Sequence, residues 1–100
     1  MAGNNWTALH FAALEGNDAV ATQLLQANAS VAAGNVSGDT PLHFAANRGH
    51  AVVADLLLKS NADPTAVNKN GYTPARRAEL RGDKDLAARL RKAEQAAAAK

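Results

Sequence analysis

Thr40-Pro41-Leu42-His43-Phe44-Ala45-Ala46 is the stretch of this sequence that decides the fold, because it occurs twice. The earlier copy, Thr7-Ala8-Leu9-His10-Phe11-Ala12-Ala13, lies 33 positions before it. Residues 7–33 and 40–66 are identical at 14 of 27 positions, and His, Phe, Gly and Thr stay in register. A third, weaker copy of the unit begins at residues 68–74, which match residues 35–41. A period of this length indicates stacked supersecondary units.

Each unit has the start and stop signals of two short helices. Thr40 can cap the first helix with its hydroxyl, and Pro41 stands where a missing N–H costs nothing. Gly49 ends this helix because glycine enters the left-handed region freely. A second helix is predicted from about His50 to Ser60, with Asn61 as a left-handed C-cap.

The apolar residues predict a thin core that is repeated from unit to unit. Hydrophobic residues make up 47% of the chain, but many are alanine and only 4% of residues are aromatic. Leu42, Ala45 and Ala46 form an apolar stripe at helical spacing, and we expect Phe11 and Phe44 to pack inward as well. A helix pair this short cannot bury its own apolar face, so the units must stack on one another.

The 33-residue period and its heptapeptide closely resemble the ankyrin repeat family, whose signature is Thr-Pro-Leu-His-x-Ala. The resemblance extends from about residue 2 to residue 92. It implies an all-α solenoid of three stacked helix-turn-helix units with projecting β-hairpin loops. We therefore expect one domain, with repeat one at 1–34, repeat two at 35–67 and repeat three at 68–100.

The first repeat departs from the pattern in its turn and at its helix start. Asn5 stands where the other repeats have Gly38 and Gly71, and Ala8 stands where they have proline. Asparagine tolerates the left-handed conformation, so we expect the turn to be kept.

The third repeat has the features of a C-terminal cap. Arg76 and Arg77 replace the His-Phe pair of the heptapeptide, and a terminal repeat needs one polar face. Asp83 can cap the last helix, whose Leu86 and Leu90 we expect to pack inward. The alanine-rich tail at residues 93–100 is expected to extend that helix and then fray.

No residue pattern in the chain points to catalysis. His10 and His43 are 33 positions apart, so each is expected to do the same local job. The family resemblance implies that this histidine hydrogen-bonds the threonine of its own motif and the backbone of the neighbouring loop. His50 has no second metal ligand nearby, and neither a phosphate-binding glycine loop nor a serine with a base is present. We expect no enzyme, no cofactor, no metal and no small-molecule substrate.

In proteins that this chain resembles, partners meet the hairpin tips and the concave face of the first helices. Carried over by register, the candidate partner-binding residues are Trp6, Leu14, Glu15, Val36, Ser37, Asp39, Asn47, Arg48, Lys69, Asn70, Tyr72, Leu80 and Arg81. Trp6, Asp39 and Tyr72 share one repeat position and are expected to form a ladder. Trp6, Arg48 and Tyr72 are the first choices, because these residue types dominate binding hot spots. The alternative for Trp6 is that it only covers the open end of the stack.

The charge is uneven along the chain, which leaves two further functions open. Residues 1–67 carry two Lys/Arg against five Asp/Glu, whereas residues 68–100 carry nine against four. The basic third repeat could bind nucleic acid or an acidic surface through Arg76, Arg77, Arg81, Lys84, Arg89, Arg91 and Lys92. Only Tyr72 is available there for base stacking, so a solubilising cap is favoured. The third possibility is a scaffold that acts as a spacer within a larger assembly.

The composition of the chain and its apolar runs indicate where in the cell we expect it. The chain has no cysteine, no apolar run approaching the roughly 18 residues of a membrane span, and no basic-apolar leader at residues 1–5. We expect a monomer in the cytoplasm, with the nucleus as the alternative, and another protein as its partner.

Overall fold

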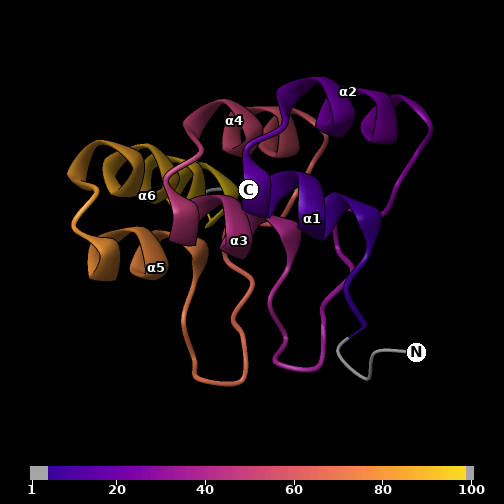
Figure 1. Cartoon of the computed structure of the whole chain (residues 1–100). Helices are drawn as coiled ribbons and strands as arrows, with labels where there is room; N and C mark the ends of the chain where they lie inside the picture. The colour runs from indigo at the N-terminus through magenta and orange to yellow at the C-terminus, as the bar shows by residue number, and fades with distance from the viewer. Residues whose placement is uncertain (1–4, 99–100) are drawn as a thin grey trace.

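Six helices follow one another as three pairs in a computed structural model that describes residues 5–98. They are α1 (Ala8–Glu15), α2 (Asp18–Gln26), α3 (Pro41–Arg48), α4 (Ala51–Lys59), α5 (Pro74–Arg81) and α6 (Lys84–Ala98). In Figure 1, α1, α3 and α5 form one row, and α2, α4 and α6 form a second row above it. The all-α stack of three helix pairs is confirmed.

The first helix of each pair begins and ends where the register predicts. The Thr40 hydroxyl accepts a hydrogen bond from the N–H of His43, and the equivalent threonines of the other repeats cap their helices in the same way. This bond satisfies a backbone donor that has no partner within the helix. Gly49 ends α3 with a φ of 75°, in the region where a Cβ atom is costly.

The second helices are also close to their predicted bounds. His50 and Ser60 flank α4 directly, and Asn61 follows with a φ of 72°. Asn5 has a φ of 59°, so the first repeat keeps a left-handed residue at this position without glycine. Asparagine accepts this conformation better than other non-glycine residues do.

The last helix is capped by Asp83, whose Oδ1 accepts from the Leu86 N–H at 3.1 Å. Leu86 and Leu90 are buried, as predicted. α6 continues to Ala98. The expected fraying beyond that point lies outside the described residues.

The loops between the pairs project from the side of α1, α3 and α5, as Figure 1 shows, but none of residues 5–98 forms a strand. Each loop tip is closed by two backbone bonds. In the first tip the Asn35 N–H donates to the Asp39 carbonyl and the Gly38 N–H donates to the Asn35 carbonyl, and the second tip has the equivalent bonds at Asn68, Gly71 and Tyr72. The asparagine side chains accept two further N–H groups in each tip. Side-chain acceptors therefore take the place of part of the backbone ladder that a β-hairpin would need.

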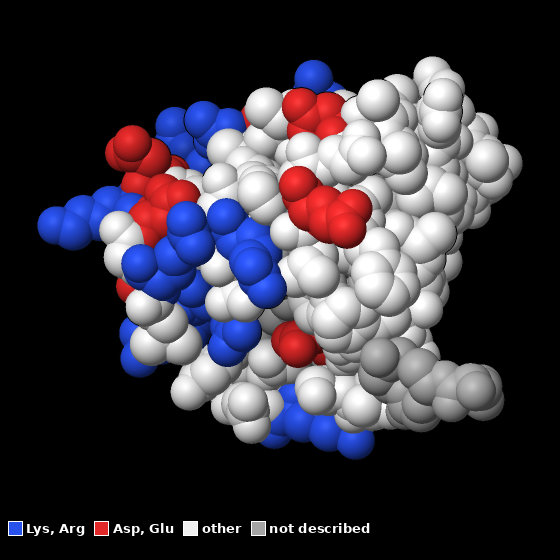
Figure 2. Space-filling model, viewed as in Figure 1, with Lys and Arg blue, Asp and Glu red and all other residues white. Residues whose placement is uncertain are grey.

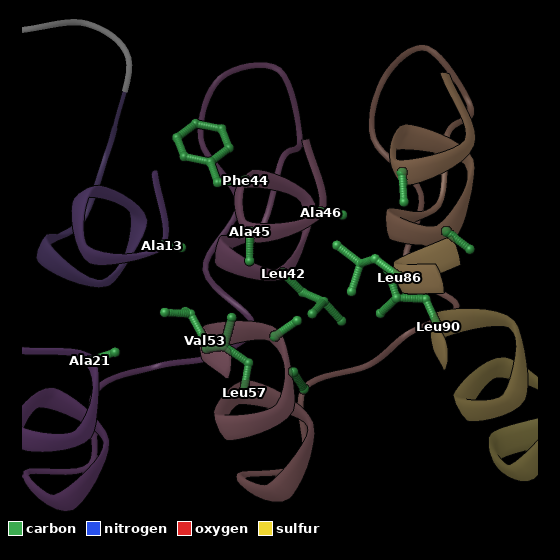
Figure 3. Packing of buried hydrophobic residues seen from close by; sticks show 14 of the residues in the cluster. Ala13, Ala21, Leu42, Phe44, Ala45, Ala46, Val53, Leu57, Leu86 and Leu90 are labelled. Atoms are coloured by element: carbon green, nitrogen blue, oxygen red, sulfur yellow. The ribbon is translucent and has the colours of Figure 1, made fainter. Parts of the chain in front are cut away.

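The core lies between the helix rows and repeats from pair to pair. Figure 3 shows Leu42, Val53 and Leu57 in the central pair, with Leu86 and Leu90 approaching from α6. Buried alanines on α1, α3 and α5, which we call the inner helices, allow these helices to approach one another closely.

The prediction that both phenylalanines pack inward holds for one of them. Phe44 is 8% exposed, whereas Phe11 is 47% exposed. Phe44 is covered by the rings of Trp6 and His10 from the first repeat. Within residues 5–98, only Trp6 makes a ring contact with Phe11. The prediction for Phe11 is wrong because no ring of another repeat within residues 5–98 covers Phe11 in the way that Trp6 and His10 cover Phe44.

Candidate functional site

The two repeated histidines hold the repeats together. The His10 Nε2 lies 2.8 Å from the Asp39 carbonyl, and the His43 Nε2 lies 2.8 Å from the Tyr72 carbonyl. A carbonyl only accepts, so Nε2 donates in both cases. Nδ1 then accepts from the backbone N–H of the motif threonine, at 3.0 Å in the first repeat and 3.1 Å in the second. The role implied by the family resemblance is confirmed, and both rings are fully buried.

Burial lowers the pKa of His43, since the protein interior disfavours a charged imidazole. The Tyr72 carbonyl and the Asp39 carboxylate oppose this shift in part, and the Arg77 guanidinium adds to it. The hydrogen bonds agree with a neutral ring, because a proton on Nδ1 would face the Thr40 N–H. His43 is therefore held as an uncharged structural residue.

His50 makes a contact between repeats rather than a ligand site. Its Nε2 donates to the Leu14 carbonyl at 3.1 Å. Its ring lies so close to Gly16 that a Cβ atom there would be 2.5 Å from Nδ1. Among residues 5–98, no group of three or more His, Cys, Asp and Glu residues is arranged to hold a metal ion. None of the helices in this range has the length and apolarity needed to cross a membrane.

The thirteen candidate partner-binding residues lie on the projecting loops, next to them, and on the last turns of α1, α3 and α5. We call them, together with Phe11, the inner surface. Sequence reasoning assigned Phe11 to the core, although its position four residues before Glu15 places both on one face of α1. Eight candidates are exposed, namely Glu15, Val36, Ser37, Arg48, Lys69, Asn70, Leu80 and Arg81. Five are partly buried, namely Trp6, Leu14, Asp39, Asn47 and Tyr72.

Aromatic residues gather at the first-repeat end of the inner surface. The Trp6 ring lies between two phenylalanines, with its centroid 4.8 Å from that of Phe44 and 5.1 Å from that of Phe11. The contact with Phe44 is edge-on, at 73° between the ring planes. Trp6 therefore packs against the second repeat, and the residue as a whole is partly buried.

The two loop tips are tied to each other. The Asn68 side-chain amide donates to the Asp39 carboxylate at 2.8 Å, and the Lys69 N–H donates to the Ser37 carbonyl at 2.9 Å. Gly38 permits this approach, since a Cβ atom there would lie 3.2 Å from the Asn68 Cα. Loops fixed in this way form a preorganised surface, which lowers the entropic cost of binding.

Several arginines of the basic third repeat form ion pairs with carboxylates of the same chain. Arg91 lies 2.7 Å from Glu79 and 3.3 Å from Glu94. The hydrogen bond from Arg91 lowers the pKa of the Glu79 carboxyl. Arg76 pairs with Glu79 at 3.4 Å, and Arg89 pairs with Asp55 at 2.6 Å. Figure 2 shows Lys and Arg gathered over the α5–α6 end of the molecule, with few charges over α1 and α2.

Comparison with known sequences agrees with this geometry. No curated protein matches the chain. The family described as ankyrin repeats, in three copies, matches residues 9–98, from the first turn of α1 to the end of α6. The match covers most of the chain and coincides with the three helix pairs. The chain therefore belongs to the ankyrin repeat family.

Proposed function

We propose that this chain is a non-catalytic module that binds a partner protein through its loop tips and inner surface. Ankyrin repeats are generally protein–protein interaction modules. The observation that carries the proposal is how the polar groups are used. His10 and His43 are committed to bonds between repeats, whereas eight candidate side chains stand exposed on a surface whose loop tips are tied together.

A nucleic-acid function for the third repeat has less support. Arg76, Arg89 and Arg91 already have carboxylate partners, so they contribute less to a surface for phosphates. Tyr72 remains the one aromatic residue of repeat three that could stack with a base.

The test compares two triple variants for their ability to capture a partner from cell extract, measured by mass spectrometry. The interface variant is Arg48→Ala/Asn70→Ala/Leu80→Ala. The control is Lys59→Ala/Gln23→Ala/Val52→Ala, on α2 and α4. Each variant removes one cation, one amide and one aliphatic side chain from exposed positions.

The expected result is a set of proteins retained by the wild type and the control but lost by the interface variant. If the interface variant retains the same set, the partner does not use the inner surface. The spacer function is then favoured. Circular dichroism of both variants shows whether the fold is kept.

A further inference from the structure

Two arginines of the inner surface differ from Arg76, Arg89 and Arg91 of the third repeat. Arg48 and Arg81 occupy the same repeat position, at the last residue of α3 and of α5. Both are exposed, and neither forms an ion pair with any carboxylate in residues 5–98. Arg76, Arg89 and Arg91, by contrast, are paired. The charge still available to a partner therefore includes two guanidinium groups on adjacent inner helices.

Arg81 is also held in place. Its Nη1 donates to the Asn47 carbonyl at 3.4 Å. Its side chain lies over Gly49, where a Cβ atom would come within 2.7 Å of Nε. A guanidinium has five N–H donors, so this single bond leaves donors for a ligand. A side chain that is already positioned loses less rotamer entropy when it binds.

The same repeat position changes sign along the stack. It is Glu15 on α1, Arg48 on α3 and Arg81 on α5. Beside the arginines stands Leu80, which is 53% exposed. Beside Glu15 lies Phe11, in contact with Trp6. The inner surface is thus aromatic with one negative charge at repeat one. It carries Asp39 and Arg48 at repeat two, and it is cationic through Lys69 and Arg81 at repeat three.

We propose that the partner segment bound on the inner surface is an acidic peptide with an apolar side chain at one end. Its carboxylates pair with Arg48 and Arg81, and its apolar end packs on Phe11 and Trp6. The inference rests on the proposed function, because it names the chemistry of the partner at that same surface. Carboxylates suit the planar donors of arginine, which bind them in a bidentate manner. Glu15 directs the acidic part away from repeat one by like-charge repulsion.

A peptide fits this surface better than a nucleic acid does. A nucleic acid carries a uniform row of phosphates, which would meet the carboxylates of Glu15 and Asp39 as well as the arginines. An acidic peptide can place its charges only where the arginines are. The change of sign from Glu15 to Arg48 and Arg81 along the inner helices therefore favours a ligand whose own charge is uneven.

The experiment is a selection from a display library of random peptides against the intact chain. The peptides have about a dozen residues, because an extended chain spans ~3.3 Å per residue and the longest dimension of the molecule is 35 Å. We expect the enriched peptides to carry an excess of Asp and Glu and an apolar residue near one end. Enrichment of neutral or basic peptides would overturn the proposal.

Two double variants separate local pairing from overall charge. Arg48→Gln/Arg81→Gln removes the two guanidinium groups that have no carboxylate partner within residues 5–98, and Arg76→Gln/Arg89→Gln removes the same charge from paired positions. The first is expected to weaken binding of an enriched acidic peptide by about a hundredfold, or tenfold for each charge-assisted pair. The second is expected to change affinity by about twofold, since rim charges act weakly on affinity. Equal losses would mean that net charge alone attracts the peptide, which would overturn the pairing.

Trp6 reports on the apolar end, because it is the single tryptophan of the chain. An enriched acidic peptide without tryptophan should shift its emission on binding. Binding with unchanged emission would show that the apolar end lies elsewhere and would overturn that part of the proposal.

The outcomes also distinguish this inference from the proposed function. If the enriched peptides are not acidic but lose binding to Arg48→Ala/Asn70→Ala/Leu80→Ala, the inner surface binds peptides and only the inference fails. If no enriched peptide depends on that variant, both fail. A thymidine oligonucleotide that displaces the peptides, with affinity falling log-linearly in salt, would assign the arginines to phosphates instead.

Discussion

The first and third repeats finish the described stack with opposite chemistry. Phe11 stands half exposed at the first repeat, whereas the equivalent residue of the third repeat is Arg77. The third repeat also carries the Glu79–Arg91 ion pair near its end. Between the two, Phe44 is buried at the same position. The burial of a side chain at this position, and so its contribution to stability, therefore depends on which residues of the neighbouring repeat cover it.

The largest effect should come from truncating the covered and the uncovered phenylalanine. Phe44→Ala removes a buried ring and its contact with Trp6, so it should lower the free energy of unfolding by about 3–5 kcal/mol. Phe11→Ala should lower it by about 1 kcal/mol or less, because its ring is already half in water. Urea denaturation measures both. Equal losses would show that Phe11 is covered in solution.

A second pair compares the helices at the two ends. Leu24 and Leu90 share one repeat position, but Leu90 is fully buried and Leu24 only partly. Leu90→Ala should cost about 2–5 kcal/mol through transfer and cavity terms. Leu24→Ala should cost less, since water already reaches that site. A larger loss of unfolding free energy for Leu24→Ala than for Leu90→Ala in the same urea titration would contradict the better burial of Leu90.

The middle repeat should make the stability of the fold depend on pH through His43. The third repeat lacks this contribution, because Arg76 stands at the equivalent position. The pKa of His43 is lowered from its usual 6.5 by burial. As the pH falls below 6.5, the unfolded chain takes up a proton on this histidine before the folded chain does. The free energy of unfolding should therefore decrease as the pH is lowered, until the pH is below the folded-state pKa as well. We expect the free energy of unfolding, measured from about pH 8 to pH 5, to depend less steeply on pH in His43→Gln than in the wild type. An unchanged slope would assign it to other groups.

The smallest effect concerns the ion pairs of the third repeat. Arg89→Gln breaks the exposed pair with Asp55 and should cost less than about 1 kcal/mol, with the loss shrinking as salt is added. Arg48→Gln is the matched control, because Arg48 has no ion pair within residues 5–98. Thermal melts at low and high salt compare the two. A salt-independent loss would show that Arg89 acts through packing instead.

Much of the fold could be predicted from the sequence, because local bonds set each helix end. Thr40, Gly49, Asn61 and Asp83 all stand where their caps were expected. Each cap involves residues a few positions apart, so a 33-residue register transfers it from repeat to repeat. The histidine contacts follow the same register, since both ends of each bond repeat with it.

The surface was less predictable because it depends on residues far apart in sequence. Arg89 meets Asp55 across 34 positions, and Arg81 lies over Gly49. No periodic signal indicates which arginines find a carboxylate and which stay free. The exposure of Phe11 was missed for a related reason, since the repeat pattern assumes a neighbour on both sides.

The histidine contacts run in one direction along the stack. His10 reaches the loop of the second repeat, and His43 reaches that of the third. The middle unit therefore carries a donor for the unit after it and an acceptor for the unit before it. A duplicate of residues 35–67 inserted after position 67 would bring both halves of this bond with it. The array should accept added units without redesign of its junctions, and each would lengthen the inner surface by one more loop.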